Sequence, residues 1–130
     1  MGLDNGITIK FTKPLKSIPL FLKNISEYDK EDSIGEYEIC YWRKCWNIRQ
    51  EIKSVLNDPD NISLAELDEI YTILTDFQSK KYWNENNDSI WDYDDIKDTL
   101  RVQRKRLKQL KSFLKRNPNI KYRIYFYDSY

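Results

Sequence analysis

The chain of 130 residues contains no histidine, only three glycines and only two cysteines, and each shortage excludes a class of site. Without histidine, the Ser-His and Cys-His pairs that activate nucleophiles are absent, as are the usual zinc sites. Three glycines cannot build a glycine-rich phosphate loop. Cys40 and Cys45 lie in a segment that we interpret as helical, so we expect two buried, unpaired thiols. We therefore expect no catalytic residues, no metal and no cofactor.

Long hydrophobic runs are missing as well. No segment approaches the roughly 20 apolar residues that span a bilayer, and the first residues lack the pattern of a signal peptide. The composition is 33% charged but also 40% hydrophobic and 15% aromatic, which is enough for a packed core. The length fits one domain. We predict a single soluble, cytoplasmic domain over residues 1–130, with no membrane partner.

Two strands are predicted, one near each end of the chain. Apolar residues alternate with polar ones over 7–11 and again over 120–127, the period of a half-buried strand. The connection over 15–25 contains proline and should lack long regular structure. Whether the two strands pair stays open at this stage.

Three amphipathic helices are predicted between the strands. Apolar residues recur at steps of three and four over about 36–56, over 63–80 and over about 89–116. Ser63 and Glu66 form a capping box at the start of the second helix. The third helix should bury a leucine stripe that includes Leu107. The fold class is therefore α+β, with three amphipathic helices packed on a small sheet formed by the N- and C-terminal strands.

The charges are strongly segregated, although the net charge is only +1. Residues 57–98 hold 12 acidic and 3 basic side chains, and residues 99–127 hold 10 basic and no acidic ones. One interpretation is an anion-binding surface on the third helix. The alternatives are a solvated helix face, neutralisation by the acidic second helix, and head-to-tail association of two copies. The candidate ligand-binding residues here are Arg101, Arg104, Lys105 and Lys108.

Aromatic residues accompany cations in two further segments. A ligand cleft commonly combines aromatic side chains with a few polar groups, but cation–π contacts inside the protein explain the same pattern. In the last strand, bases could stack on aromatic rings while cations hold phosphates, although tyrosine is also a good strand former. The candidate ligand-binding residues are Tyr41, Trp42, Arg43, Lys44 and Trp46 in the first segment and Arg123 and Tyr125 in the second.

Three features of the sequence resemble a loose group of small bacteriophage and prophage proteins without an established function. They are the opening Met-Gly-Leu-Asp before a strand, the Tyr-Trp-Arg-Lys quartet at 41–44 opening a helix, and a tyrosine-rich final strand. The resemblance implies a phage or mobile-element origin and action in the cytoplasm of a bacterial host. It implies no chemistry. Independently, Asp4 beside the first strand is placed to pair with Arg43 or Lys44.

Together these features favour a binding protein over an enzyme. The first hypothesis is a phage accessory protein of the anti-defence type, which binds and sequesters a phosphate-bearing nucleotide signal or a host protein. The alternative is nucleic-acid binding through the basic third helix and the last strand. A less favoured reading is a small carboxylate- and metal-dependent enzyme that uses Asp92, Asp94 and Asp95. Association of copies into a homo-oligomer stays open.

Overall fold

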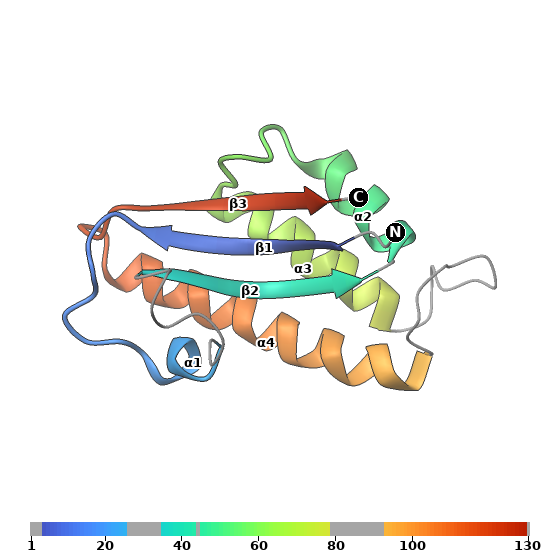
Figure 1. The fold of residues 1–130 in the computed structure, drawn as a ribbon, viewed down its shortest axis with the longest axis horizontal. Helices are drawn as coiled ribbons and strands as arrows, with labels where there is room; N and C mark the ends of the chain where they lie inside the picture. The colour runs from blue at the N-terminus through green and yellow to red at the C-terminus, as the bar shows by residue number, and fades with distance from the viewer. Residues whose placement is uncertain (1–3, 26–34, 44, 79–92, 130) are drawn as a thin grey trace.

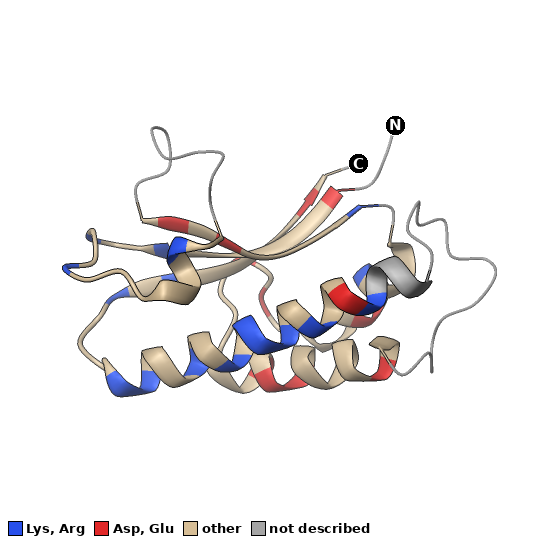
Figure 2. Ribbon diagram, turned by 90° about the horizontal axis from the view of Figure 1, so that it is seen from below, with Lys and Arg blue, Asp and Glu red and all other residues tan. Residues whose placement is uncertain are grey.

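The computed structural model describes residues 4–25, 35–43, 45–78 and 93–129, except for the side chains of 93–96. The described elements form two layers: the sheet lies in front of the long helices in Figure 1 and above them in Figure 2. This arrangement confirms the predicted α+β class. In chain order the elements are β1 (Asp4–Phe11), α1 (Leu20–Lys23), β2 (Glu36–Arg43), α2 (Trp46–Val55), α3 (Leu64–Gln78), α4 (Tyr93–Arg116) and β3 (Tyr122–Ser129).

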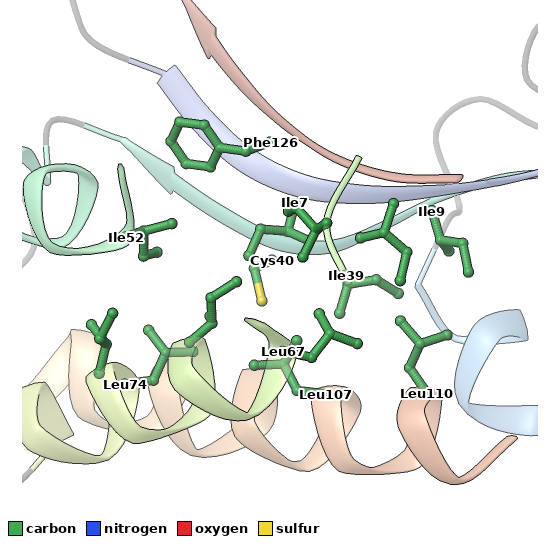
Figure 3. Close-up of a cluster of buried hydrophobic side chains, with 14 of the residues drawn as sticks. Ile7, Ile9, Ile39, Cys40, Ile52, Leu67, Leu74, Leu107, Leu110 and Phe126 are labelled. Atoms are coloured by element: carbon green, nitrogen blue, oxygen red, sulfur yellow. The ribbon is translucent and has the colours of Figure 1, made fainter. Parts of the chain in front are cut away.

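The sheet has the order β2-β1-β3, and both outer strands run antiparallel to β1. The strands predicted at the two ends of the chain therefore pair: Ile7 lies opposite Phe126, and Ile9 lies opposite Ile124. All four side chains are buried. They lie on the face that packs against the long helices, and Figure 3 shows Ile7 and Ile9 pointing toward α3 and α4. Alternate residues of a strand share a face, so one face of the sheet forms the core and the other faces away from the helices.

The predicted helix over 36–56 is half wrong. Residues Glu36–Arg43 form the strand β2, and the helix α2 begins only at Trp46. The Tyr-Trp-Arg part of the quartet therefore ends a strand instead of opening a helix. The helical interpretation required Trp42 and Trp46 to share one helix face. In the structure they lie on different elements, so they do not share a face.

A β-bulge explains this error. Thr8 lies opposite Glu38 while Ile7 lies opposite Cys40, so the pairing with β1 skips Ile39. Ile39 and Cys40 are consequently buried side by side. The strict polar–apolar alternation of a strand is broken at this point. The apolar residues that follow run on into α2 at intervals of three and four, which is the spacing of a helix.

The other two predicted helices are confirmed. At the start of α3 the Ser63 N–H donates to Glu66 Oε1 at 2.9 Å, and the Glu66 N–H donates to Ser63 Oγ at 3.2 Å. The backbone hydrogen bond from Ser63 is the largest of the effects that lower the pKa of Glu66. The leucine stripe of α4 is buried as predicted, at Leu100, Leu107, Leu110 and Leu114.

The outer edge of β3 is covered by the connection between α2 and α3. The Ile62 N–H donates to the Ile124 carbonyl at 2.7 Å, and the Phe126 N–H donates to the Pro59 carbonyl at 2.7 Å. These bonds occupy backbone groups that an edge strand otherwise exposes to pairing with another chain.

The edge of β2 is held by side chains from α4. Gln103 is buried, and its Nε2 donates to the Tyr41 carbonyl at 3.1 Å while its Oε1 accepts from the Trp42 indole N–H at 2.9 Å. Arg106 Nη1 donates to the Ile39 carbonyl at 3.4 Å. Gln103 therefore fixes both the strand edge and the largest fully buried side chain of the core.

One hydrophobic core joins all seven elements. Cys40 and Cys45 belong to it as buried thiols that form no disulfide, as the sequence predicted, and burial raises the pKa of Cys40. Within residues 12–25, the described part of the connection after β1, the only regular element is the short α1, whose Leu22 is buried. Among the described helices, none has the length and apolar character needed to cross a membrane.

Candidate anion-binding site

The structure distributes the sequence-predicted ligand-binding residues over several parts of the fold. Lys44 lies outside the described residues. The described members do not form a single site. Tyr41, Trp42 and Arg43 lie on β2, Trp46 begins α2, Arg101, Arg104, Lys105 and Lys108 lie on α4, and Arg123 and Tyr125 lie on β3.

The two tryptophans have different environments. Trp42 is fully buried in the core, so its indole is a structural group. Trp46 is 38% exposed, and the Arg49 guanidinium lies 5.7 Å from its ring centroid. Arg49 also forms an ion pair with Asp128 of β3 at 2.7 Å. The cation–π contact that the sequence suggested is thus made inside the protein, but by Arg49 and not by the neighbouring Arg43.

Part of the basic face of α4 is used against α3. The Arg104 guanidinium and the Lys108 ammonium lie 4.8 and 4.7 Å from the ring centroid of Tyr71. Hydrogen bonding from Lys108, and then from Arg104, lowers the pKa of Tyr71. Lys111 forms an ion pair with Asp68. These contacts support the interpretation that the second predicted helix neutralises part of the third.

Other cations of α4 point to solvent. Arg101, Lys105 and Lys115 are exposed, and their spacing places them on one side of the helix. Arg101 lies 3.8 Å from Asp98, but both side chains are exposed, and such pairs are worth about 0–1 kcal/mol. This stripe belongs to the part of the predicted basic surface that remains accessible, as does Lys108, which is exposed although it contacts Tyr71.

A cavity of about 710 Å³ lies at the end of the sheet near α1. Its walls come from the segment after β1, from the last turns of α4 and from the segment before β3. The lining residues are Thr12, Lys13, Pro14, Leu15, Lys16, Ser17, Phe113, Asn117, Asn119, Ile120 and Lys121.

Strand pairing brings these distant segments together. Phe11 lies opposite Tyr122 at the end of the β1–β3 ladder, so the chain leaving β1 and the chain entering β3 run side by side. The Thr12 N–H then donates to the Lys121 carbonyl at 3.0 Å. Phe113 supports the cavity from α4 and makes an edge-to-face contact with Phe11, with ring centroids 6.5 Å apart. Both walls are therefore anchored to the core.

The cavity is strongly basic. Its described lining includes three lysines, Lys13, Lys16 and Lys121, and no carboxylate. The acids of segment 26–34 lie outside the described residues and are not part of this balance. Figure 2 shows Lys and Arg in blue on the loops at this end of the sheet, away from the chain termini. The adjoining last turn of α4 adds Lys115 and Arg116.

The C-terminus of α4 adjoins the cavity, and a helix C-terminus normally disfavours anions. Here Asn117 satisfies two of the last carbonyls: its N–H donates to Leu114 at 3.3 Å, and its Nδ2 donates to Phe113 at 2.8 Å. These hydrogen bonds reduce the exposed negative charge beside the lysines. Leu15 and Ile120 supply apolar surface that continues into the core.

Sequence reasoning missed this cavity. Its residues lie about a hundred positions apart, and only the pairing of β1 with β3 places them together. Lys121 belonged to the basic segment but was not singled out. The signal that could have indicated it was the Lys-Pro-Leu-Lys sequence at 13–16, directly after the first strand. Proline restricts the backbone there, so the two lysines lie on a loop of defined conformation, and such loops often carry binding residues.

The metal hypothesis is not tested by the part of the chain that the structure describes. No group of three or more Cys, Asp or Glu side chains is gathered there to hold a metal ion. The aspartates of the carboxylate hypothesis, Asp92, Asp94 and Asp95, have side chains outside the described part. No family model, curated protein or solved structure matches this chain.

Proposed function

We propose that this protein captures a phosphate-bearing small molecule of the nucleotide class in the basic cavity. The observation that carries the proposal is the combination of three lysines, no described carboxylate and a volume of about 710 Å³. Ligand sites commonly have volumes of 300 to 1,000 Å³ and combine apolar walls with a few polar groups. The cavity fits this pattern.

Each kind of lining residue has a chemical role in the proposal. The ammonium groups of Lys13, Lys16 and Lys121 bind phosphate oxygens by charge-assisted hydrogen bonds. The apolar side chains, which include Leu15 and Ile120, cover the base or the sugar. One N–H of the Asn117 side-chain amide is used for the Phe113 carbonyl, so its second N–H and its carbonyl oxygen can hydrogen-bond to the ligand.

The biological role that we propose is sequestration. The resemblance to small phage proteins supports action inside an infected bacterial cell, where a host defence signal of nucleotide type is a suitable ligand. Stoichiometric capture requires affinity and abundance but no catalytic group. The protein is accordingly proposed to be an anti-defence binding protein.

Calorimetric titration tests the proposal. ATP, a cyclic dinucleotide and inorganic triphosphate are titrated into the protein at 50 and 500 mM salt. We expect at least one nucleotide to bind more tightly than inorganic triphosphate, because the apolar walls contribute only to the nucleotide. Binding should weaken at the higher salt concentration. Absence of heat for all three at 50 mM salt, or tighter binding of inorganic triphosphate, would contradict nucleotide capture.

A second candidate is binding of a nucleic-acid backbone along α4. The exposed stripe of Arg101, Lys105 and Lys115 favours it, since a helix rises 1.5 Å per residue and presents these cations over about 21 Å. Steep salt dependence with generic duplexes, at equal affinity for unrelated sequences, would support this candidate over the cavity.

A further inference from the structure

The face of the sheet that points away from α3 and α4 carries an ordered set of side chains. By alternation it presents Gly6 and Thr8 from β1, and Tyr125 and Tyr127 from β3. No described helix covers it (Figure 2). This surface, called here the tyrosine face, consists of Asp4, Gly6, Thr8, Lys10, Glu36, Glu38, Tyr41, Arg43, Arg123, Tyr125 and Tyr127.

The tyrosine side chains of β3 reach across the central strand. Tyr127 starts from β3, yet its hydroxyl donates to Glu38 Oε2 on β2 at 2.6 Å. Tyr125 reaches Glu36 on β2 in the same way. Gly6 and Thr8, beneath these rings, are buried although no described helix covers them. The hydroxyls are satisfied within the chain, so the outward surface of the two rings is apolar.

The charges of the tyrosine face balance. Asp4, Glu36 and Glu38 oppose Lys10, Arg43 and Arg123, so the face has no net charge. A polyanion is a poor occupant, because two of the acids form a row on β2 beside the rings. Exposed aromatic and arginine side chains without net charge are instead typical of the centre of a protein interface.

The charges at one level of the two outer strands are self-complementary. Glu36 and Arg123 are both opposite Lys10, one on β2 and one on β3, and therefore lie at the same level of the sheet. A two-fold axis parallel to β1 superposes β2 of one copy on β3 of the other. Glu36 of each copy then faces Arg123 of its partner, and Tyr41 faces Tyr127. Lys10 and Asp4 of the central strand lie near the axis and face their own copies, so the match between two copies of this chain depends on the outer strands.

We infer that the tyrosine face is the interface of a two-fold symmetric dimer, in which the two sheets pack face to face. Aligned packing of twisted sheets provides the geometry. Three strands spaced about 4.8 Å apart and eight residues long offer a face of roughly 400 Å² in projection. Two such faces bury roughly 800 Å² in all, less than the roughly 1,200 to 2,000 Å² of stable specific interfaces, so we expect a weak dimer with a dissociation constant in the micromolar range. The inference does not depend on the proposed function.

Sedimentation velocity between 5 and 300 μM tests the inference with two charge reversals. Wild type should shift from monomer to dimer over this range. Glu36→Arg and Arg123→Glu should each stay monomeric at 300 μM, because each places two pairs of like charges across the axis. An equimolar mixture of the two variants should form a dimer again, because both pairs then have opposite charges. Lys105→Glu, on the exposed side of α4, should dimerise like wild type. Circular dichroism establishes that each variant is folded.

Each other outcome overturns the inference. These are a wild type that is monomeric at 300 μM, single variants that dimerise as well as wild type, and a mixture that fails to associate. Because the mixture joins different molecules, an ion pair within one chain cannot produce its recovery. Association of wild type only in the presence of an oligonucleotide would assign the face to nucleic acid instead.

Discussion

Tyr127 lies directly over Gly6 on the tyrosine face. A β-carbon at Gly6 would be 2.8 Å from Cε1 of Tyr127 and 2.4 Å from the carbonyl oxygen of Cys40. The first neighbour is a side chain, but the second is backbone at the bulge and cannot move away without breaking the β1–β2 pairing. Glycine is therefore required here by close approach.

Gly6→Ala should accordingly destabilise the fold by at least about 2 kcal/mol, the range of strongly disruptive single substitutions. Urea unfolding measures the change. Lys10→Ala on the same strand is the control and should stay within about 0.5 kcal/mol of wild type, because Lys10 is exposed. An alanine variant at position 6 as stable as this control would show that the bulge is placed differently.

Tyr41 should make stability depend on alkaline pH. Desolvation, followed by the hydrogen bond that its hydroxyl donates to Asp4 Oδ1 at 2.7 Å, raises the pKa of Tyr41 to about 12. The unfolded chain has a tyrosine pKa of about 10. Between these values the folded state holds a proton that the unfolded state has lost, so stability falls as pH rises from about 10 to 12.

Urea unfolding at pH 9 and pH 11, on wild type and Tyr41→Phe, measures this effect. Tyr125 and Tyr127 also have raised pKa values, so both proteins should lose stability. Wild type should lose more, because the variant lacks one of the groups that titrate. A larger loss in Tyr41→Phe would contradict the hydrogen bond to Asp4.

Gln103 should contribute strongly to stability. Gln103→Leu keeps the side chain's approximate size but leaves the Trp42 indole N–H and the Tyr41 carbonyl without their partner. Unsatisfied buried groups cost about 1 to 3 kcal/mol each, so we expect a loss of about 2 to 4 kcal/mol in chemical unfolding. A loss below about 1 kcal/mol would mean that water replaces the amide. The Trp42 fluorescence should also shift, because its environment changes.

Replacing Asn5 should raise the stability of the fold, whereas replacing Gln103 should lower it. It is fully buried in β1, and neither polar atom of its side chain has a hydrogen-bond partner among the described residues. Asn5→Val removes these unsatisfied groups and introduces a residue that favours strands, so stability should rise by about 1 kcal/mol. A decrease of the same size in the melting experiment would indicate that residues 1–3 or 44 supply partners to the amide.

Local patterns predicted the parts of the fold that local physics determines. The capping box at Ser63, the leucine stripe of α4 and the alternation in β1 and β3 each depend on residues close in sequence. The bulge at Ile39 and Cys40 does not, because it is defined only by pairing with Ile7 and Thr8. A helix was therefore predicted where β2 forms.

The candidate sites also depend on contacts between residues that are distant in the sequence, which local patterns do not predict. The cation-rich character of α4 was readable, but the use of Arg104 and Lys108 against Tyr71 depends on how α4 packs on α3. The cavity requires Lys13 and Lys121 to meet across paired strands. Composition therefore favoured the hypothesis of an anion-binding protein, whereas the location of the proposed site required the topology.

The most direct measurement of the central claim compares two variants with equal loss of charge in one calorimetric series with ATP. Lys13→Gln/Lys16→Gln/Lys121→Gln removes three cations from the cavity, and Arg101→Gln/Lys105→Gln/Lys115→Gln removes three from α4. Hydrogen bonds to charged groups contribute about 1.5 to 3 kcal/mol each, and 1.4 kcal/mol is a tenfold change in affinity. We predict that the cavity variant binds ATP at least about 100-fold more weakly than wild type, while the α4 variant stays within about threefold. Equal losses in the two variants, or a larger loss in the α4 variant, would contradict the assignment of the cavity.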